Sequence, residues 1–248
     1  MPDWSSIARL LVENLALHRR PMGLHYQSER PEGAIGFKSA GSGCLVALLK
    51  NVEKGKIAAL SREQSGCFGG RLYCGFADGP SEGQAEYVST GIPGRMEGEH
   101  YLKSPELVRG AWRDYPPPAA SDQWLVFQLL DMYGDDSRPE VVFFFARPDS
   151  IAGLHFLACY DRGVEGVIAP FTSGCGGIVG FPRLEAARGT HRAVLGLFDP
   201  SARITEEADV LSFAVDVERF LEMVGNIGES FLQHPVWAKL KKRMISKT

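Results

Sequence analysis

Apolar residues in this chain follow two kinds of spacing, and their order predicts alternating helices and strands. Runs with apolar positions three or four apart, many opened by a capping residue such as Asp3, are typical of helices. Short runs of branched and aromatic residues between turn signals are typical of strands. We predict helices over residues 3–17, 44–52, 104–112, 148–160, 178–187, 217–223 and 231–244, the last broken near His234-Pro235. We predict strands over residues 22–27, 34–37, 56–60, 124–130, 141–145, 164–170, 193–198 and 210–215.

This alternation predicts an α/β or mixed α+β fold, with a mixed sheet flanked by helices and with two similar halves as one arrangement. Residues 77–123 are rich in glycine and proline and include the rigid spacer 116–118. A loop-rich stretch of that length is usually a functional lid or a connection. We therefore expect a single domain over 1–248, with sub-halves 1–112 and 124–248 joined by the proline-rich connection.

Composition excludes several classes of protein. The 248 residues are 44% hydrophobic and 23% charged, and the formal net charge is −3, so no basic surface for nucleic acid is expected. No apolar run approaches the roughly 20 residues that span a bilayer, and the first residues do not read as a signal peptide. Five cysteines without close spacing fit reduced thiols, so we expect a soluble cytoplasmic protein.

The most informative motif is Ser-Gly-Cys, which occurs three times. It contains three of the five cysteines and is found at 42–44, 65–67 and 173–175, and the last two copies are followed by further glycines. A thiol on a glycine-flanked turn is open to an approaching ligand. The first copy is expected at a helix start, and the second and third follow extended runs.

One interpretation is a metal centre. Cys44, Cys67 and Cys175 could hold an iron–sulfur cluster or a metal with one open position, since both prefer thiolate ligands. The absence of any Cys-x₂-Cys pair excludes a zinc knuckle. Backbone N–H groups of neighbouring glycines would complete the cofactor site; these glycines are Gly66, Gly69, Gly70, Gly174, Gly176 and Gly177.

Two other interpretations need no metal. Cys44 or Cys175 at a helix start would be a stabilised thiolate and a nucleophile. Alternatively, the glycine turns form a pocket for a small anion or metabolite, without catalysis. The charge partners expected for an anion are Arg62, Arg71, Arg147 and Arg183. The plain structural reading is that the glycines allow backbone to pass close to backbone, while Cys74 and Cys159 belong to the core.

The order of motifs resembles the domain of unknown function 169 family. The resemblance covers most of residues 15–225. It rests on six features of the sequence, in chain order: the proline-led segment 20–24 with 31–33, Cys44, the cysteine- and glycine-rich segment 67–76, the strand-to-helix segment 139–154, the third cysteine motif at 173–178, and the last strand and helix at 208–223. One departure is Phe68, where the family often has a proline. The resemblance implies a soluble bacterial or archaeal protein and supplies no catalytic residues, because the family has no established activity.

Overall fold

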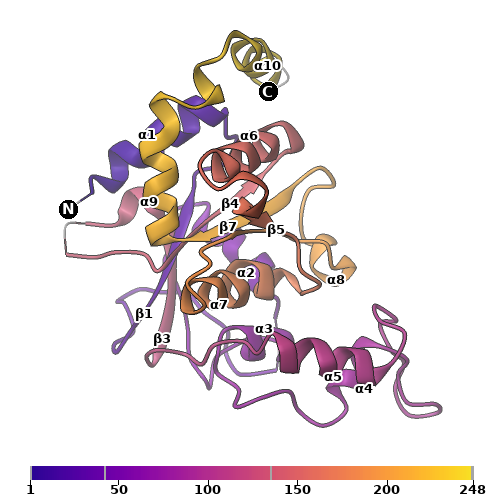
Figure 1. Cartoon of the computed structure of the whole chain (residues 1–248). Coiled ribbons are helices and arrows are strands. Elements are labelled where there is room, and N and C mark those ends of the chain that lie inside the picture. Colours follow the sequence, from indigo (N-terminus) through magenta and orange to yellow (C-terminus); the bar gives the residue numbers. More distant parts are fainter. Residues whose placement is uncertain (1, 42, 135, 247–248) are drawn as a thin grey trace.

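The computed structural model describes residues 2–41, 43–134 and 136–246. Its centre is an open seven-stranded mixed sheet in the order β2-β3-β1-β4-β7-β6-β5, which confirms the predicted fold class (Figure 1). Only the pair β5·β6 is parallel; all other neighbours are antiparallel. The strands are β1 (Met22–Gln27), β2 (Ala58–Leu60), β3 (Trp124–Leu129), β4 (Val141–Ala146), β5 (Val167–Ile168), β6 (Ala193–Gly196) and β7 (Leu211–Asp216).

Both faces of the central strands are buried. In β4, Val141, Phe143 and Phe145 pack into one apolar cluster, and the alternate residues pack into the other. This explains why the segment reads as an unbroken apolar run, since a strand covered on both sides has no polar face. Helices α1 (Trp4–Leu15), α6 (Pro148–Cys159), α9 (Val217–Gly225) and α10 (Pro235–Ile245) contribute to the second cluster.

The opposite face of the sheet holds the elements that carry the cysteine motifs. They are α2 (Leu45–Val52), α3 (Phe68–Tyr73), the π-helical turn η3 (Gly176–Gly180) and α7 (Phe181–Ala187). Near them lie the short helices α4 (Gln84–Val88), α5 (Pro105–Asp114) and α8 (Pro200–Arg203) (Figure 1). Short 3₁₀ turns occur at Leu130–Met132, Gly163–Gly166, Asn226–Gly228 and Phe231–Gln233.

Most predicted elements are present, with some differences. The helix start at Asp3 is confirmed, because its carboxylate accepts a hydrogen bond from Ser6 N. Residues 34–37 form only an isolated bridge, from Ile35 to Ala58, instead of a strand. The expected strand 164–170 is reduced to two residues of β5 by the preceding 3₁₀ turn. Helices α3, α4 and α8 were not predicted, because they are too short to display a helical period.

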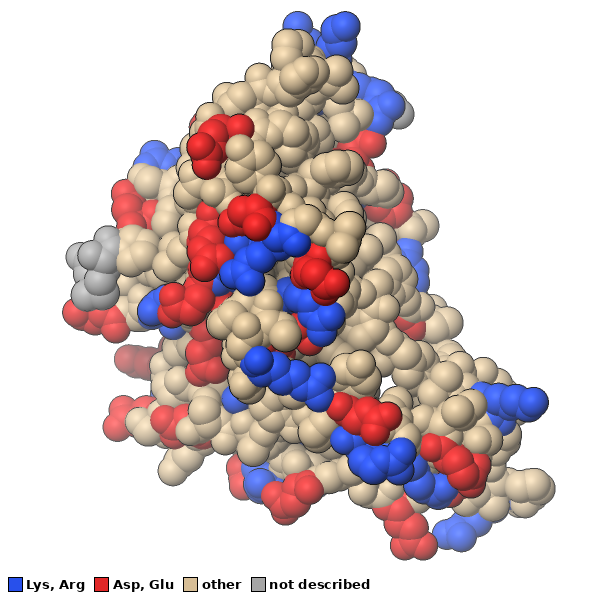
Figure 2. Space-filling model, in the orientation of Figure 1, with Lys and Arg blue, Asp and Glu red and all other residues tan. Residues whose placement is uncertain are grey.

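Residues 77–123 are not a structureless loop. They contain α4 and α5, which pack on each other around Val108 and Trp112, and this small cluster joins α3 through Leu72. In Figure 1 the α4–α5 pair projects from the body of the protein beside α3. Figure 2 shows acidic and basic side chains interspersed on this face.

A glycine-rich helix packs tightly under the sheet at the third motif. The helix begins at Gly174, widens into η3 and continues as α7. A Cβ atom at Gly176 would lie 1.8 Å from Thr172 Oγ1 and 3.0 Å from the Tyr73 ring, whereas one at Gly177 would have no neighbour closer than 3.5 Å. Gly176 is therefore required by packing, and the adjacent Gly177 is not.

This difference predicts opposite effects of the same substitution at neighbouring positions. Gly176→Ala should lower the free energy of unfolding by roughly 1–3 kcal/mol through overpacking. Gly177→Ala should leave it unchanged or raise it by up to about 1 kcal/mol, because alanine favours the helix. Urea denaturation measures both values, and equal effects of the two substitutions would contradict the packing argument.

Candidate functional site

The three Ser-Gly-Cys motifs lie at three helix starts around one cavity. Cys44 is the N-cap residue of α2, Cys67 is the N-cap residue of α3, and Cys175 is the second residue of the helix that begins at Gly174. All three cysteines line a cavity of about 860 Å³. Ser42, from the first motif, lies outside the described residues. The repeated motif thus gathers in space, although its copies are far apart in the sequence.

The glycines of the first two motifs hold one aromatic ring between them. A Cβ atom at Gly43 or Gly66 would lie 2.4 or 2.5 Å from the Phe37 ring. Both glycines also have positive φ, at 90° and 75°, which favours glycine. Cys67 N donates a hydrogen bond to Gly43 O at 2.9 Å and joins the two turns. These glycines therefore have a packing role that is independent of any ligand.

The predicted cofactor-binding glycines divide into two groups. Gly69, Gly70 and Gly174 line the cavity. Gly66, Gly176 and Gly177 do not line it: Gly66 contacts Phe37, and the other two are buried in the helix that follows Cys175. Gly174 itself fits against α2, where a Cβ atom would lie 2.9 Å from Val46 Cγ2.

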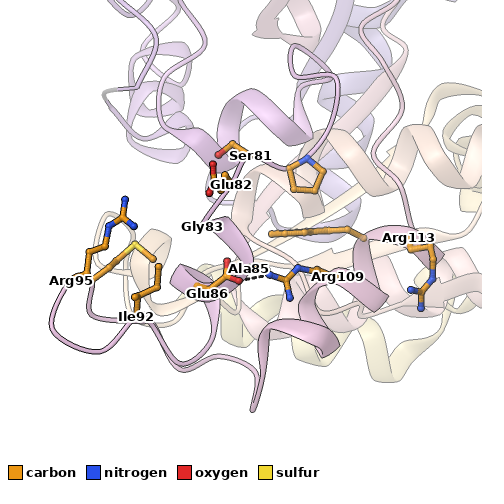
Figure 3. A pocket seen from close by; sticks show the side chains of 12 residues that line it. Ser81, Glu82, Gly83, Ala85, Glu86, Ile92, Arg95, Arg109 and Arg113 are labelled. Carbon is orange, nitrogen blue, oxygen red and sulfur yellow. Dashed lines mark hydrogen bonds and ion pairs between the residues drawn. The ribbon is translucent and has the colours of Figure 1, made fainter.

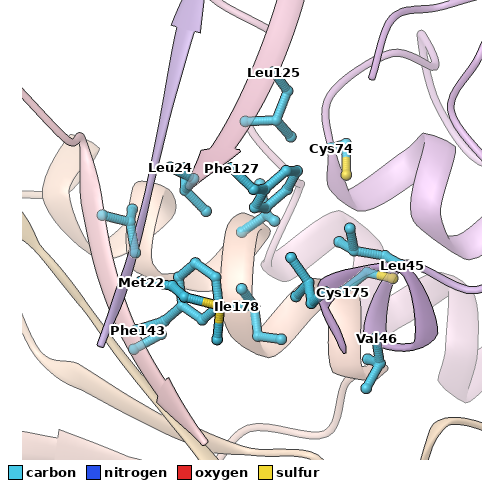
Figure 4. Packing of buried hydrophobic residues seen from close by; sticks show 14 of the residues in the cluster. Met22, Leu24, Leu45, Val46, Cys74, Leu125, Phe127, Phe143, Cys175 and Ile178 are labelled. Carbon is cyan, nitrogen blue, oxygen red and sulfur yellow. The ribbon is translucent and has the colours of Figure 1, made fainter. Parts of the chain in front are cut away.

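Two of the sulfur atoms face each other across Gly70. A Cβ atom at Gly70 would lie 3.7 Å from Cys67 Sγ and 3.8 Å from Cys175 Sγ, so the sulfurs are no farther apart than the sum of these distances. Figure 4 shows Cys175 beside Leu45, with Cys74 nearby among apolar side chains. Within 2–41, 43–134 and 136–246, no three His, Cys, Asp or Glu side chains are placed to hold a metal ion. Ligation by the three cysteines stays a prediction.

Burial controls the chemistry of the deepest thiols. It raises the pKa of the Cys175 thiol well above its usual range, and the thiols of Cys67, Cys74 and Cys44 act in the same direction. Burial also raises the pKa of the Cys74 thiol to about 12. The prediction of a stabilised thiolate at Cys175 is therefore wrong, because desolvation exceeds the effect of the helix start. Cys74 is a core residue, as predicted, whereas Cys159 is partly exposed.

Asp199 is an acidic group of this cavity that the sequence analysis missed. It lines the wall as the N-cap residue of α8. Its Oδ1 is buried without a hydrogen-bond partner, while Oδ2 accepts from Ser201 Oγ at 3.3 Å. Burial raises the pKa of Asp199 to about 6, and backbone N–H groups that include Gly174 N oppose this rise. In the sequence, Asp199 is marked only by the proline that follows it, and Asp-Pro by itself indicates no more than the N-cap of a helix.

The lining also contains a second, partly buried acidic group and several aromatic rings. Burial raises the pKa of Glu99, and the side chains of Tyr101 and Ser201 oppose that rise. The described residues of the lining include no lysine, arginine or histidine. Its aromatic members are Phe68, Tyr73, Tyr87, Tyr101, Trp112, Phe171 and Phe198. Trp112 Nε1 donates to the Tyr73 hydroxyl at 3.2 Å and so links α5 to α3.

The arginines predicted to bind an anion lie elsewhere, so that prediction is wrong for these four residues. Arg62 pairs with Asp78, Arg147 with Glu207 and Asp209, and Arg183 with Glu140. Arg71 is on α3, outside the cavity lining. Local carboxylates from other elements satisfy most of these charges, and sequence spacing does not reveal such pairs.

A second cavity adjoins the first beneath α4 and α5. Its volume is about 1190 Å³, and it shares Ser81, Glu82, Gly83, Met96 and Trp112 with the cysteine cavity. Figure 3 shows Arg109 joined to Glu86 there, with Arg95 and Arg113 on opposite sides. The basic groups therefore do not converge on one point. Residues 77–123 supply walls to both cavities.

Burial predicts the order in which the thiols react. With iodoacetamide at neutral pH, Cys44 and Cys67 should react first, because they are partly exposed, and Cys74 and Cys175 should react last. A pKa of about 12 leaves Cys74 with roughly a thousandfold less thiolate than an ordinary cysteine. Peptide mass spectrometry at successive times measures the order. Fastest labelling of Cys175 would show instead that this thiol is activated.

Comparison with known proteins adds a family and no more. No curated protein and no solved structure matches the chain. No helix among the described residues is both long and apolar enough to cross a membrane. The model of the domain of unknown function family DUF169, described as "Uncharacterised ArCR", matches residues 10–226. Since this match covers most of the 248 residues and agrees with the order of motifs, the chain belongs to the DUF169 family.

Proposed function

We propose that this protein binds a small organic metabolite in the cavity lined by Cys44, Cys67 and Cys175, without a metal. The observation that carries the proposal is the lining itself: aromatic rings and thiols line one cavity together with the carboxyl group of Asp199. Ligand cavities of about 300–1,000 Å³ typically combine an apolar lining with a few such polar groups. The volume of about 860 Å³ lies within this range.

The state of the thiols fits a cavity wall. Burial raises the pKa of the Cys175 thiol, so this thiol is neutral when no metal is bound. A neutral buried thiol behaves as a small, polarizable apolar group. In this reading, the cysteines and the glycines Gly69, Gly70 and Gly174 shape the cavity and do not carry out a reaction.

Gly69 offers a way to close the cavity without disturbing the backbone. A Cβ atom at Gly69 would have only Ser173 Oγ near it, at 4.0 Å, and both residues line the cavity. A leucine there should extend into the space that a ligand would occupy. Gly225, at the end of α9, has nothing within 4 Å of its Cβ position and is the matched control away from the cavity.

We expect at least one member of a metabolite library to raise the melting temperature of the wild-type protein and of Gly225→Leu. Gly69→Leu should show a clearly smaller shift, because the leucine side chain occupies part of the cavity beside Ser173. A ligand at 100 times its Kd adds about 2.7 kcal/mol of stability, which corresponds to roughly 5–10 °C for a chain of this size. Differential scanning fluorimetry measures the shift. Equal shifts in Gly69→Leu would locate binding outside the cavity and contradict the proposal.

The second candidate is an iron–sulfur cluster with an open position, and the placement of three cysteines on one cavity favours it. Cys44, Cys67 and Cys175 would be its ligands, and glycine N–H groups would donate to its sulfurs. Such a cluster would require the Cys175 thiol to lose its proton on binding.

Anaerobic purification separates the two candidates. For the metal-free pocket we expect colourless protein without stoichiometric iron. A cluster would give a broad absorbance near about 400 nm and bound iron, both lost in Cys67→Ala and Cys175→Ala but retained in the control Cys159→Ala. That result would replace the metal-free proposal with the cluster.

A further inference from the structure

We propose that the ligand of the cysteine cavity is an organic cation, with an amine or quaternary ammonium group held between Asp199 and the aromatic rings. This inference rests on the proposed function and specifies the chemical class of its ligand. It goes beyond the family assignment, which supplies no ligand.

The first support is the sign of charge in the cavity. Glu82, Glu99 and Asp199 line it, and among its described lining residues no basic side chain balances them. Some buried carboxylates elsewhere in the protein do have such a partner: Glu206 has Arg19 at 2.9 Å, and Glu185 has Arg192 at 2.7 Å. Asp199 has no ion-pair partner among the described residues. A bound cation would provide the missing counter-charge.

The second support is the exposure of the rings. Phe68, Tyr87, Phe171 and Phe198 are between 39 and 47% exposed, and all four line the same cavity. A cluster of large, solvent-exposed apolar side chains around a cavity usually marks a binding site. Ring faces attract ammonium groups, and quaternary ammonium ions are bound by aromatic cages in this way. Rings combined with carboxylates favour an organic cation over a neutral apolar molecule.

Helix starts by themselves favour the opposite charge, because free N–H groups at a helix start attract anions. At the third motif, however, the Asp199 carboxylate of the protein itself occupies the place of such an anion. The N–H of Gly174 lies close enough to Asp199 to lower the pKa of that carboxyl, and Ser173 Oγ accepts from Gly176 N at 3.3 Å. Asp199 therefore offsets the positive end of this helix start, and its carboxyl belongs to the lining of the cavity.

An inorganic cation is a poorer fit than an organic one. No three His, Cys, Asp or Glu side chains in the described part of the chain are placed around a common metal position. The cavity is also far larger than a single ion requires, with a volume of about 860 Å³. An ammonium group that carries an organic body would fill more of this space.

The test compares two probes that differ in charge and hardly in shape. Choline carries a quaternary nitrogen, and 3,3-dimethyl-1-butanol has a neutral carbon in its place. Isothermal titration of the full chain at pH 7.5 should show choline binding at least about tenfold more tightly than the alcohol. Asp199→Asn should remove most of that preference, whereas the control Asp122→Asn, at an exposed position, should retain it.

The preference should also depend on pH. Because the pKa of Asp199 is raised to about 6, its carboxylate is largely lost at pH 5 and present at pH 7.5. Choline binding should therefore weaken by about tenfold as the pH falls between these values. Other titratable groups that face the cavity are Glu82, Glu99, the three thiols, Tyr73, Tyr87 and Tyr101. Protonation of Glu99 would act in the same direction, so Asp199→Asn should flatten the curve without removing it entirely.

The outcomes separate this inference from the proposed function. Equal affinity for choline and the alcohol, or no binding of choline up to 10 mM (about the concentration of a weak ligand), would overturn the cation proposal. If both probes bind equally and Gly69→Leu weakens both, the cavity still binds metabolites and only the charge assignment fails. Choline affinity that is unchanged in Gly69→Leu would place the cation elsewhere and overturn the proposal.

Discussion

Close approach of backbone and side chains at the Ser-Gly-Cys turns is the constraint on which the site depends. Phe37 fits between Gly43 and Gly66 only because neither has a Cβ atom, and Gly174 meets Val46 of α2 for the same reason. With larger residues at these positions, the starts of α2, α3 and the third helix would be held apart. Their close approach brings the three thiols to one cavity.

The same packing limits what the thiols can do. A helix start lowers the pKa of a thiol, whereas burial in an apolar cluster raises it. At Cys175 only 5% of the residue is exposed, and the neighbouring thiols add to the effect of burial. Burial therefore prevails, and the residue that looked like a nucleophile in sequence is a neutral part of the wall. A helix start alone is insufficient evidence for an activated cysteine.

Sequence reasoning succeeded where a property is local. The strand Met22–Gln27 and the helix Leu45–Val52 follow from apolar spacing and capping signals, and the family follows from the order of motifs. Even the shared cavity could be anticipated, because a repeated turn motif has a common structural role. The aromatic lining could not, since Tyr87 and Phe198 reach the cavity from α4 and from the loop before α8.

Asp199 was missed for a related reason. Its sequence neighbours indicate an ordinary cap, and its importance arises from burial and from the nearby N–H of Gly174, which are properties of the folded chain. The predicted arginines failed in the opposite way: Arg183 reaches Glu140, a carboxylate from a distant segment, instead of the cavity.

The shape of the cavity and its charge thus depend on different parts of the chain. The glycine turns determine the shape, whereas Asp199 and Glu99 determine the sign of the charge. Glycine-flanked helix starts would by themselves favour an anion, because free N–H groups at a helix start attract negative charge. Asp199 reverses this preference at the third helix by placing a carboxylate beside Gly174 N, and Glu99 adds a second acid on the same wall. A change confined to residues 198–202 could therefore alter which ligands the cavity admits while the three turns and their thiols keep their positions.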